Sequence, residues 1–127
     1  MILGIDLGQK TTGLAISEGN FASPYFTIKH QSIREAVIKI SQICDQFNIN
    51  KLIIGFVEGK IKSYFQNFVK NFKKEKPNVE VILWDETLTT RQARRYLIKL
   101  QVPKTKRKQK EHEIAASIIL QSYLDSQ

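Results

Sequence analysis

The sequence predicts a single α/β domain over residues 1–127, built on a mixed five-stranded sheet with helices on both faces. Three short apolar runs follow one another at the start, which predicts a β-hairpin extended by a third antiparallel strand. From residue 32 onward, segments with helical spacing alternate with apolar strands, which indicates parallel strands joined by helices. The length suits one domain with a sizeable core.

The opening hairpin, predicted from strands over 1–7 and 12–18, carries one acid near the end of its first strand. This carboxylate, Asp6, is costly unless it is solvated, paired or bound to a cation. Gly8 and Gly13 let a backbone or a phosphate group approach closely. Actin-like ATPases and sugar kinases hold nucleotide phosphates with such a hairpin, whereas ribonuclease H-like nucleases hold a divalent metal with its Asp. The first class needs two domains across a cleft, and 127 residues are too few for both.

The third strand, over 22–28, contains Pro24, which predicts an edge or strand-start position because proline cannot donate to the ladder. A capping box from Ser32 to Glu35 then marks the start of an amphipathic helix. The elements predicted from there on are a helix over 33–47, a buried strand over 51–56, a helix over 61–72, a strand over 79–84, a helix from 89 that ends before Pro103, and a C-terminal helix over 114–123.

Two groups of aromatic residues have the spacing of core positions, although each group could also form a base-stacking platform. Strand and helix periodicity favours the core for both. The groups are Phe21, Tyr25 and Phe26, and Tyr64, Phe65, Phe68 and Phe72.

The positive charge is concentrated in one segment. The chain carries a net charge of +8, and residues 91–110 hold nine basic residues and no acid. Such a concentration is typical of nucleic-acid binding, with a solvated helix face and a basic loop as the alternative. The candidates in this segment are Arg91, Arg94, Arg95, Lys99, Lys104, Lys106, Arg107, Lys108 and Lys110. In the hairpin turn, Gln9, Lys10 and Thr11 are further candidates for phosphate contact, with simple turn chemistry as the alternative.

Three features indicate a cytoplasmic protein without a membrane partner. The lone Cys44 excludes an internal disulfide and suits a reducing compartment. The apolar runs are much shorter than the roughly 20 residues that span a bilayer. Met1 leads directly into a strand, which is not the pattern of a signal peptide.

Residues 4–17 (GIDLGQKTTGLAIS), 85–90 (DETLTT) and 115–125 (AASIILQSYLD) are three blocks spread, in order, over the chain. Together they resemble the signature blocks of the YqgF/RuvX family, bacterial proteins described as Holliday junction resolvases or pre-16S rRNA nucleases. The resemblance implies a ribonuclease H-like fold, dependence on a divalent metal and cleavage of structured nucleic acid. Maturation of the 5′ end of ribosomal RNA is the best supported role in that family.

Phosphodiester chemistry gives an independent reason to group the acids. Hydrolysis uses a bound cation to neutralise the developing charge and to activate a water. Mg²⁺ takes oxygen ligands and keeps several waters, so a few carboxylates suffice. In this fold Asp6 and the Asp85–Glu86 pair converge at one edge of the sheet, so we expect Asp6 and Glu86 to bind Mg²⁺ or Mn²⁺, with Asp85 as the alternative to Glu86. The other interpretations are a turn cap for Asp6 and an acidic helix start for Asp85 and Glu86.

The third expected ligand departs from the family pattern, because the usual aspartate falls on His112. On a helix His112 shares a face with Ala116, so it should point toward the sheet. A neutral imidazole binds Mn²⁺-type ions, whereas Mg²⁺ prefers oxygen. The alternatives are that Glu111 or Glu113 reaches in, or that activity is weakened. For His30 the sequence predicts no functional role.

These observations predict a metal-dependent nuclease that acts on structured RNA in the 5′-end maturation of pre-16S rRNA. Cleavage of branched DNA at a Holliday junction is the runner-up, and a nucleic-acid-binding protein with impaired catalysis is the alternative of a different class. Monomer and homodimer both remain open, although junction cleavage would favour a dimer.

Overall fold

The computed structural model describes residues 1–56, 62–86 and 111–127, and its elements confirm the predicted fold class. In chain order they are β1 (Ile2–Leu7), β2 (Thr11–Ser17), β3 (Ser23–Lys29), α1 (Ile33–Gln46), β4 (Lys51–Phe56), α2 (Lys62–Glu75), β5 (Glu80–Asp85) and α5 (Glu111–Asp125). Their ends lie within three residues of the predicted ones; the largest differences are at the end of α2 and the start of α5. The helix predicted from residue 89 lies outside the described residues.

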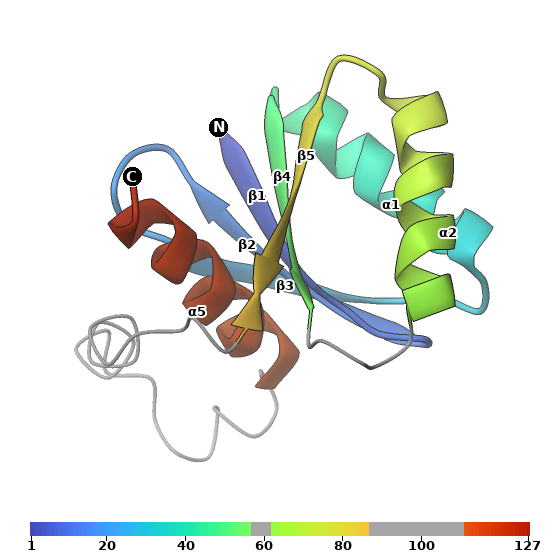
Figure 1. Cartoon of the computed structure of the whole chain (residues 1–127), viewed down its shortest axis with the longest axis horizontal. Helices are drawn as coiled ribbons and strands as arrows, with labels where there is room; N and C mark the ends of the chain where they lie inside the picture. The colour runs from blue at the N-terminus through green and yellow to red at the C-terminus, as the bar shows by residue number, and fades with distance from the viewer. Residues whose placement is uncertain (57–61, 87–110) are drawn as a thin grey trace.

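The strands form a five-stranded sheet in the order β3-β2-β1-β4-β5 (Figure 1). β1 pairs antiparallel with β2 and parallel with β4, and β5 continues the sheet parallel to β4. The carboxyl ends of β1, β4 and β5 therefore meet at the same edge. In register, Asp6 lies beside Gly55, and Phe56 lies beside Asp85.

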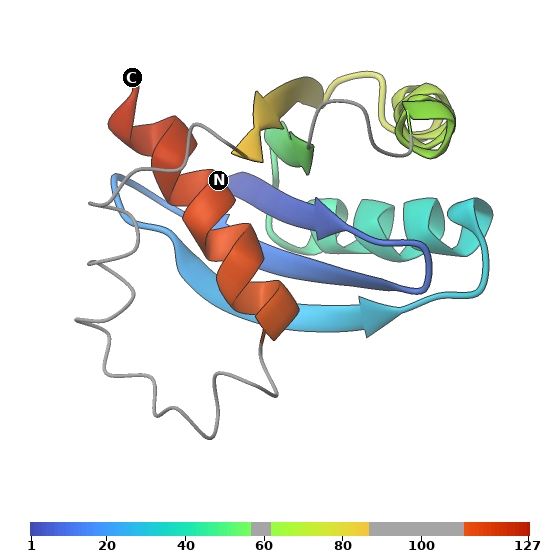
Figure 2. The same ribbon diagram turned by 60° about the horizontal axis from the view of Figure 1, so that its bottom comes forward.

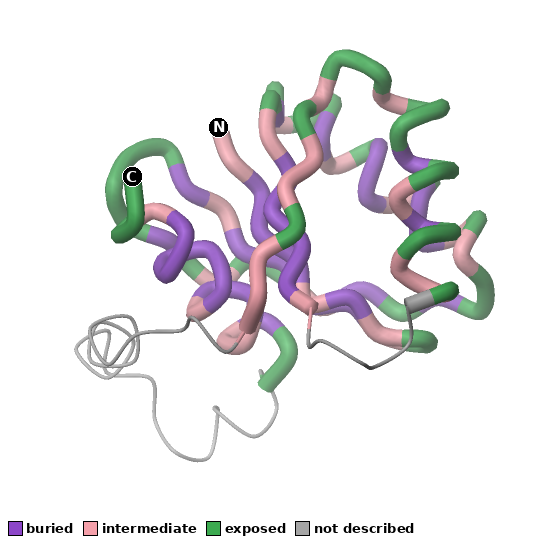
Figure 3. The backbone as a smooth tube through the Cα atoms, in the orientation of Figure 1, coloured by how far each residue is buried: buried purple, intermediate pink, exposed green. Residues whose placement is uncertain are grey.

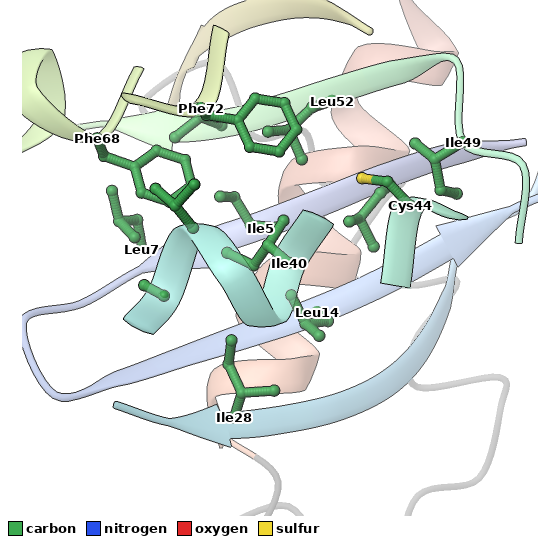
Figure 4. Packing of buried hydrophobic residues seen from close by; sticks show 14 residues of the cluster. Ile5, Leu7, Leu14, Ile28, Ile40, Cys44, Ile49, Leu52, Phe68 and Phe72 are labelled. Carbon is green, nitrogen blue, oxygen red and sulfur yellow. The ribbon is translucent and has the colours of Figure 1, made fainter. Parts of the chain in front are cut away.

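The helices divide between the two faces of this sheet. α1 and α2 contact each other, and with the sheet they enclose the larger core. In this core Phe68 and Phe72 stack on each other among Leu7, Ile40 and their neighbours (Figure 4). α5 crosses the opposite face over β1 and β2 (Figure 2). Figure 3 shows the buried backbone running through the central strands and through most of α5.

The start of α1 follows the predicted capping pattern. The Ser32 hydroxyl accepts a hydrogen bond from the Glu35 backbone N–H at 3.1 Å. The Glu35 carboxylate reaches back to the N–H of Gln31 at 3.2 Å. The first bond satisfies a donor that the first turn of a helix leaves free. The second goes to the residue before the N-cap, one position earlier than in a capping box, and ties the chain that leaves β3 to the start of α1.

α5 packs unusually close to the sheet because the strands beneath it present glycines. A Cβ placed on Gly13 of β2 would overlap the carbonyl of His112, and one on Gly55 of β4 would overlap the Ile119 side chain. On β1, a Cβ at Gly4 would lie 2.7 Å from the Leu120 Cβ. The predicted close approach at Gly13 is therefore made by α5 itself.

The core assignment of the aromatic residues is correct for α2 and wrong for the segment around β3. Phe68 and Phe72 are fully buried, and Tyr64 and Phe65 pack against the same core. In contrast, Phe21 is 63% exposed, Phe26 56% and Tyr25 39%. The physical reason is that β3 is an edge strand, with a register shift opposite Leu14 and Ala15 that breaks its alternation. Pro24 lies on this edge strand, as predicted.

His30 follows β3 and is nearly buried, at 3% exposure. Its Nε2 lies 2.8 Å from the Thr12 hydroxyl, and its Nδ1 has no hydrogen-bond partner among the described residues. Burial lowers the pKa of the imidazole, and Lys39 lowers it further, while Glu35 opposes the shift. Burial therefore favours the neutral form of His30 in the folded protein.

None of the helices that the structure describes has the length and apolarity needed to cross a bilayer.

We expect Gly13→Ala to destabilise the fold by about 1–3 kcal/mol, because the new methyl group meets the helix backbone and forces α5 away from the sheet. The matched control is Gly19→Ala, since a Cβ at Gly19 has no heavy atom within 4 Å. Urea unfolding of both variants measures the difference. A Gly13 variant as stable as the Gly19 variant would contradict this packing.

For His30→Gln we expect a flatter dependence of stability on pH than in the wild type. A lowered folded-state pKa means that the unfolded chain binds the proton more readily, so the wild type loses stability as pH falls below the ordinary value of 6.5. The slope due to one proton is at most about 1.4 kcal/mol per pH unit. Parallel pH profiles of the two proteins would show that His30 is not held neutral.

Candidate active site

The site centres on Asp6, the residue before the last of β1. In the sheet it lies opposite Gly13 of β2 and beside Gly55 of β4, so both neighbouring positions lack side chains. Its side chain is only 26% exposed. Burial raises the pKa of the carboxyl, and the nearby charge of Glu111 adds to the rise, while His112 and Glu86 oppose it. The structure thus keeps a carboxylate where its charge is poorly solvated.

His112 lies in the first turn of α5 and faces this carboxylate, as the helix periodicity predicts. Its Nδ1 is 3.8 Å from Oδ2 of Asp6, which is an ion-pair distance longer than a hydrogen bond. Its Nε2 is 3.3 Å from the Thr11 hydroxyl. The ring remains 47% exposed, so solvent or a ligand reaches it.

Glu86 follows β5 and joins the same cluster. Its side chain makes a hydrogen bond with Asp6 that lowers the pKa of Asp6. Its Cγ lies 3.2 Å from where a Cβ would stand on Gly55, so the missing side chain at Gly55 leaves room for it. Two carboxyl groups this close to each other would suit a shared cation.

Asp85 and Glu113 are placed differently from these groups. Trp84 packs on Tyr123 of α5, so strand alternation turns Asp85 to the opposite face and brings Glu86 back toward α5. Asp85 does not contribute to the pKa shift of Asp6. Glu113 is buried, at 9% exposure, and likewise does not contribute to that shift. Of the two glutamates that flank His112, Glu111 is the one whose charge reaches Asp6.

The side chains around Asp6 supply only some of the ligands that a hard divalent cation needs. In the described part of the chain, no group of three or more His, Cys, Asp and Glu side chains is arranged to hold a metal. Mg²⁺ is nevertheless commonly bound by one or two carboxylates together with waters and substrate phosphates. The contact between Asp6 and Glu86 and the poorly solvated charge of Asp6 match such an open site. The imidazole of His112 would suit Mn²⁺ better than Mg²⁺.

Of the basic residues that are candidates for phosphate contact, the structure describes Lys10. Lys10 is exposed at the tip of the β1–β2 hairpin. The Tyr64 hydroxyl of α2 donates to the carbonyls of Gly8 at 3.0 Å and Gln9 at 3.4 Å, and so holds this tip. Sequence reasoning assigned Tyr64 to the core alone, because its spacing carries no signal for the hydroxyl contact. The other candidates, Arg91, Arg94, Arg95, Lys99, Lys104, Lys106, Arg107, Lys108 and Lys110, lie outside the described residues.

Known proteins resemble this chain over nearly its whole length. The RuvX family model, described as Holliday junction resolvase, matches residues 1–126. A relative from Caldanaerobacter subterraneus, named "Putative pre-16S rRNA nuclease", is 39% identical over 99% of this chain and 96% of its own length. A relative of the same name from Bacillus cytotoxicus is 39% identical over 98% of each chain.

Solved structures confirm the ribonuclease H-like fold. RuvC of T. thermophilus in complex with a Holliday junction substrate superposes with a TM-score of 0.67 at 13% identity, covering 98% of this chain and 93% of that chain. The fowlpox virus resolvase bound to Holliday junction DNA gives a TM-score of 0.62 at 20% identity, covering 98% and 97%. With a family match over nearly its whole length and relatives well above 30% identity, the chain belongs to the RuvX (YqgF) family of nucleases.

Proposed function

We propose that this protein is a divalent-metal-dependent nuclease that cleaves structured RNA in the 5′-end maturation of pre-16S rRNA. The substrate is supported by the names of its relatives, which are 34–39% identical over almost the whole chain. The chemistry is supported above all by Asp6, a poorly solvated carboxyl in contact with Glu86 and facing His112. Burial and the charge of Glu111 disfavour the ionised form of Asp6, and a bound cation would offset that negative charge.

In this proposal Asp6 and Glu86 would hold the metal through oxygen, and His112 would offer a ring nitrogen beside them. The bound cation would neutralise charge that develops on the phosphate and lower the pKa of a water. The partial exposure of Asp6 and His112 leaves the outer side of the cluster open to a phosphodiester. Lys10, held at the hairpin tip by the contacts of Tyr64, would attract the same phosphate backbone.

Two other functions remain distinguishable by experiment. The description of the matching family favours cleavage of a Holliday junction. The imidazole at position 112, where the family pattern has an aspartate, favours a protein that binds nucleic acid with weakened catalysis. A cleavage assay with pre-16S rRNA fragments and four-way DNA junctions, each with Mg²⁺ or Mn²⁺, separates all three. Binding of either substrate without cleavage under both metals would support the binding function and contradict ours.

For the proposed metal site, one prediction concerns Asp6→Asn. Without metal at neutral pH, the variant should unfold at a higher temperature than the wild type, because a raised pKa means that folding disfavours the ionised carboxyl. At a metal concentration of about 100 times Kd the wild type should gain about 2.7 kcal/mol, and the variant should lose most of this gain. Cleavage should fall by more than about a hundredfold, since even an outer-shell partner of a metal is worth 10- to 100-fold.

The matched control for this experiment is Asp45→Asn. Asp45 is exposed, pairs with Lys76 at the far ends of α1 and α2, and should leave both metal stabilisation and cleavage unchanged. Thermal unfolding with and without Mn²⁺, together with the cleavage assay, provides the measurements. Wild-type metal stabilisation and cleavage in Asp6→Asn would remove Asp6 from the site.

Another prediction concerns the basic segment. Replacing Lys106, Arg107 and Lys108 by Ala should weaken binding to unrelated RNA and DNA alike, because phosphate contacts do not depend on sequence. Each lost contact should reduce the slope of log affinity against log salt by about 0.7–0.9. An unchanged slope, measured by fluorescence anisotropy over a salt series, would place the binding surface elsewhere.

A further inference from the structure

The hydroxyl of Thr11 makes the second polar contact of the His112 ring. Its Oγ1 lies 3.3 Å from Nε2, while Nδ1 on the other side of the ring lies 3.8 Å from Asp6. The ring therefore spans the distance between a hydroxyl on β2 and a carboxylate on β1. A partner on one ring nitrogen fixes which way the other nitrogen faces.

The placement of Thr11 follows from the register of the sheet. Thr11 and Gly13 are two residues apart on β2, so they share the face that α5 covers. Gly13 lies opposite Asp6 on the neighbouring strand. The backbone of His112 packs directly against Gly13. β2 thus fixes His112 at two points, with Gly13 under its backbone and Thr11 against its ring.

We propose that Thr11 is a positioning residue for His112. The Thr11 hydroxyl accepts a hydrogen bond from Nε2–H of the ring, and this leaves the lone pair of Nδ1 turned toward Asp6. This inference rests on the proposed metal site and deepens it, because it assigns the nitrogen that would bind the cation. In the structure Nδ1 lies 3.8 Å from Oδ2 of Asp6, which is beyond ordinary hydrogen-bond range. Nε2 lies 3.3 Å from the Thr11 hydroxyl, within that range, and this oxygen can accept from Nε2–H.

This role differs from the one that the sequence suggests for Thr11, which is contact with a substrate phosphate. A phosphate-binding hydroxyl would affect substrate affinity and leave the metal unaffected. A positioning hydroxyl affects the metal in the absence of any nucleic acid. Metal binding by the free protein therefore separates the two roles.

The first test measures Mn²⁺ affinity by calorimetry without nucleic acid. Thr11→Val keeps the shape of the side chain and removes the hydroxyl, and should weaken Mn²⁺ binding about tenfold or more. Thr11→Ser keeps the hydroxyl and should restore affinity to within about twofold of wild type. The matched control is Thr27→Val, the same change at a buried hydroxyl on the neighbouring strand that has no hydrogen-bond partner among the described residues. It should leave the affinity unchanged.

A double-mutant cycle shows whether Thr11 acts through the ring. In a His112→Ala background, Thr11→Val should change Mn²⁺ affinity by less than about twofold, because the group that it positions is gone. An equal loss of affinity in both backgrounds would overturn the proposal and assign Thr11 a general structural role. Wild-type affinity in Thr11→Val would overturn it as well.

The second test reads the ring directly in the metal-free protein. At a pH well above the ordinary imidazole pKa of about 6.5, nitrogen chemical shifts of His112 should show the proton on Nε2 in the wild type and in Thr11→Ser. Thr11→Val should lose this preference. A proton on Nδ1 in the wild type would overturn the proposal whether or not metal binds. Absence of Mn²⁺ binding by the wild type, with the Nε2 proton in place, would instead contradict the proposed metal site and leave Thr11 as the residue that orients His112.

Discussion

The contact between α5 and the glycines of the sheet is the constraint on which the candidate site depends. The distance between a helix and a sheet is normally set by the side chains that pack between them. Here β1, β2 and β4 each have a glycine, without a side chain, where α5 packs. The helix start is thereby brought down to the level of the strand backbones, so that His112 lies across from Asp6 on the neighbouring strand. Side chains at these positions would separate the two groups, and the glycines are therefore as much a part of the candidate site as the proposed ligands.

The close packing of α5 on the sheet also disfavours the charge of Asp6. Asp6 is surrounded by glycine backbone and by the start of α5, which shields it from water and raises its pKa, and Glu111 adds a like charge. Local energetics therefore disfavour the ionised form that would bind a cation. Natural sequences retain such conflicts where function requires them, and stability is supplied elsewhere. Here the larger core of α1, α2 and the sheet lies on the other face and has no part in this conflict.

The order of the elements could be predicted from sequence because each element has a strong local pattern, such as the capping box at Ser32 or the uniformly apolar β4. The preference for Glu86 over Asp85 agrees with strand alternation, once Trp84 is known to pack on α5. The aromatic residues around β3 were misassigned because periodicity reports a face and not whether another element covers it. The hydroxyl contacts of Thr11 and Tyr64 were missed for a related reason: they depend on how separate elements meet, which spacing along one element does not encode.

The basic residues that would attract nucleic acid and the acidic residues of the candidate site lie in different parts of the sequence. Residues 91–110 carry nine basic residues, and the rest of the chain holds eleven basic and twelve acidic residues, a net charge of −1. The cluster around Asp6, with Glu86 and Glu111, would by itself repel a phosphodiester. A substrate approaching this edge therefore needs positive charge from two sources: a cation on the carboxylates, and basic side chains elsewhere in the chain. Because these sources are independent, the imidazole at position 112 would affect the first in the proposed site and leave the second unchanged. We therefore expect a variant that has lost catalysis to keep its affinity for nucleic acid. An assay of cleavage decides the function, whereas an assay of binding does not.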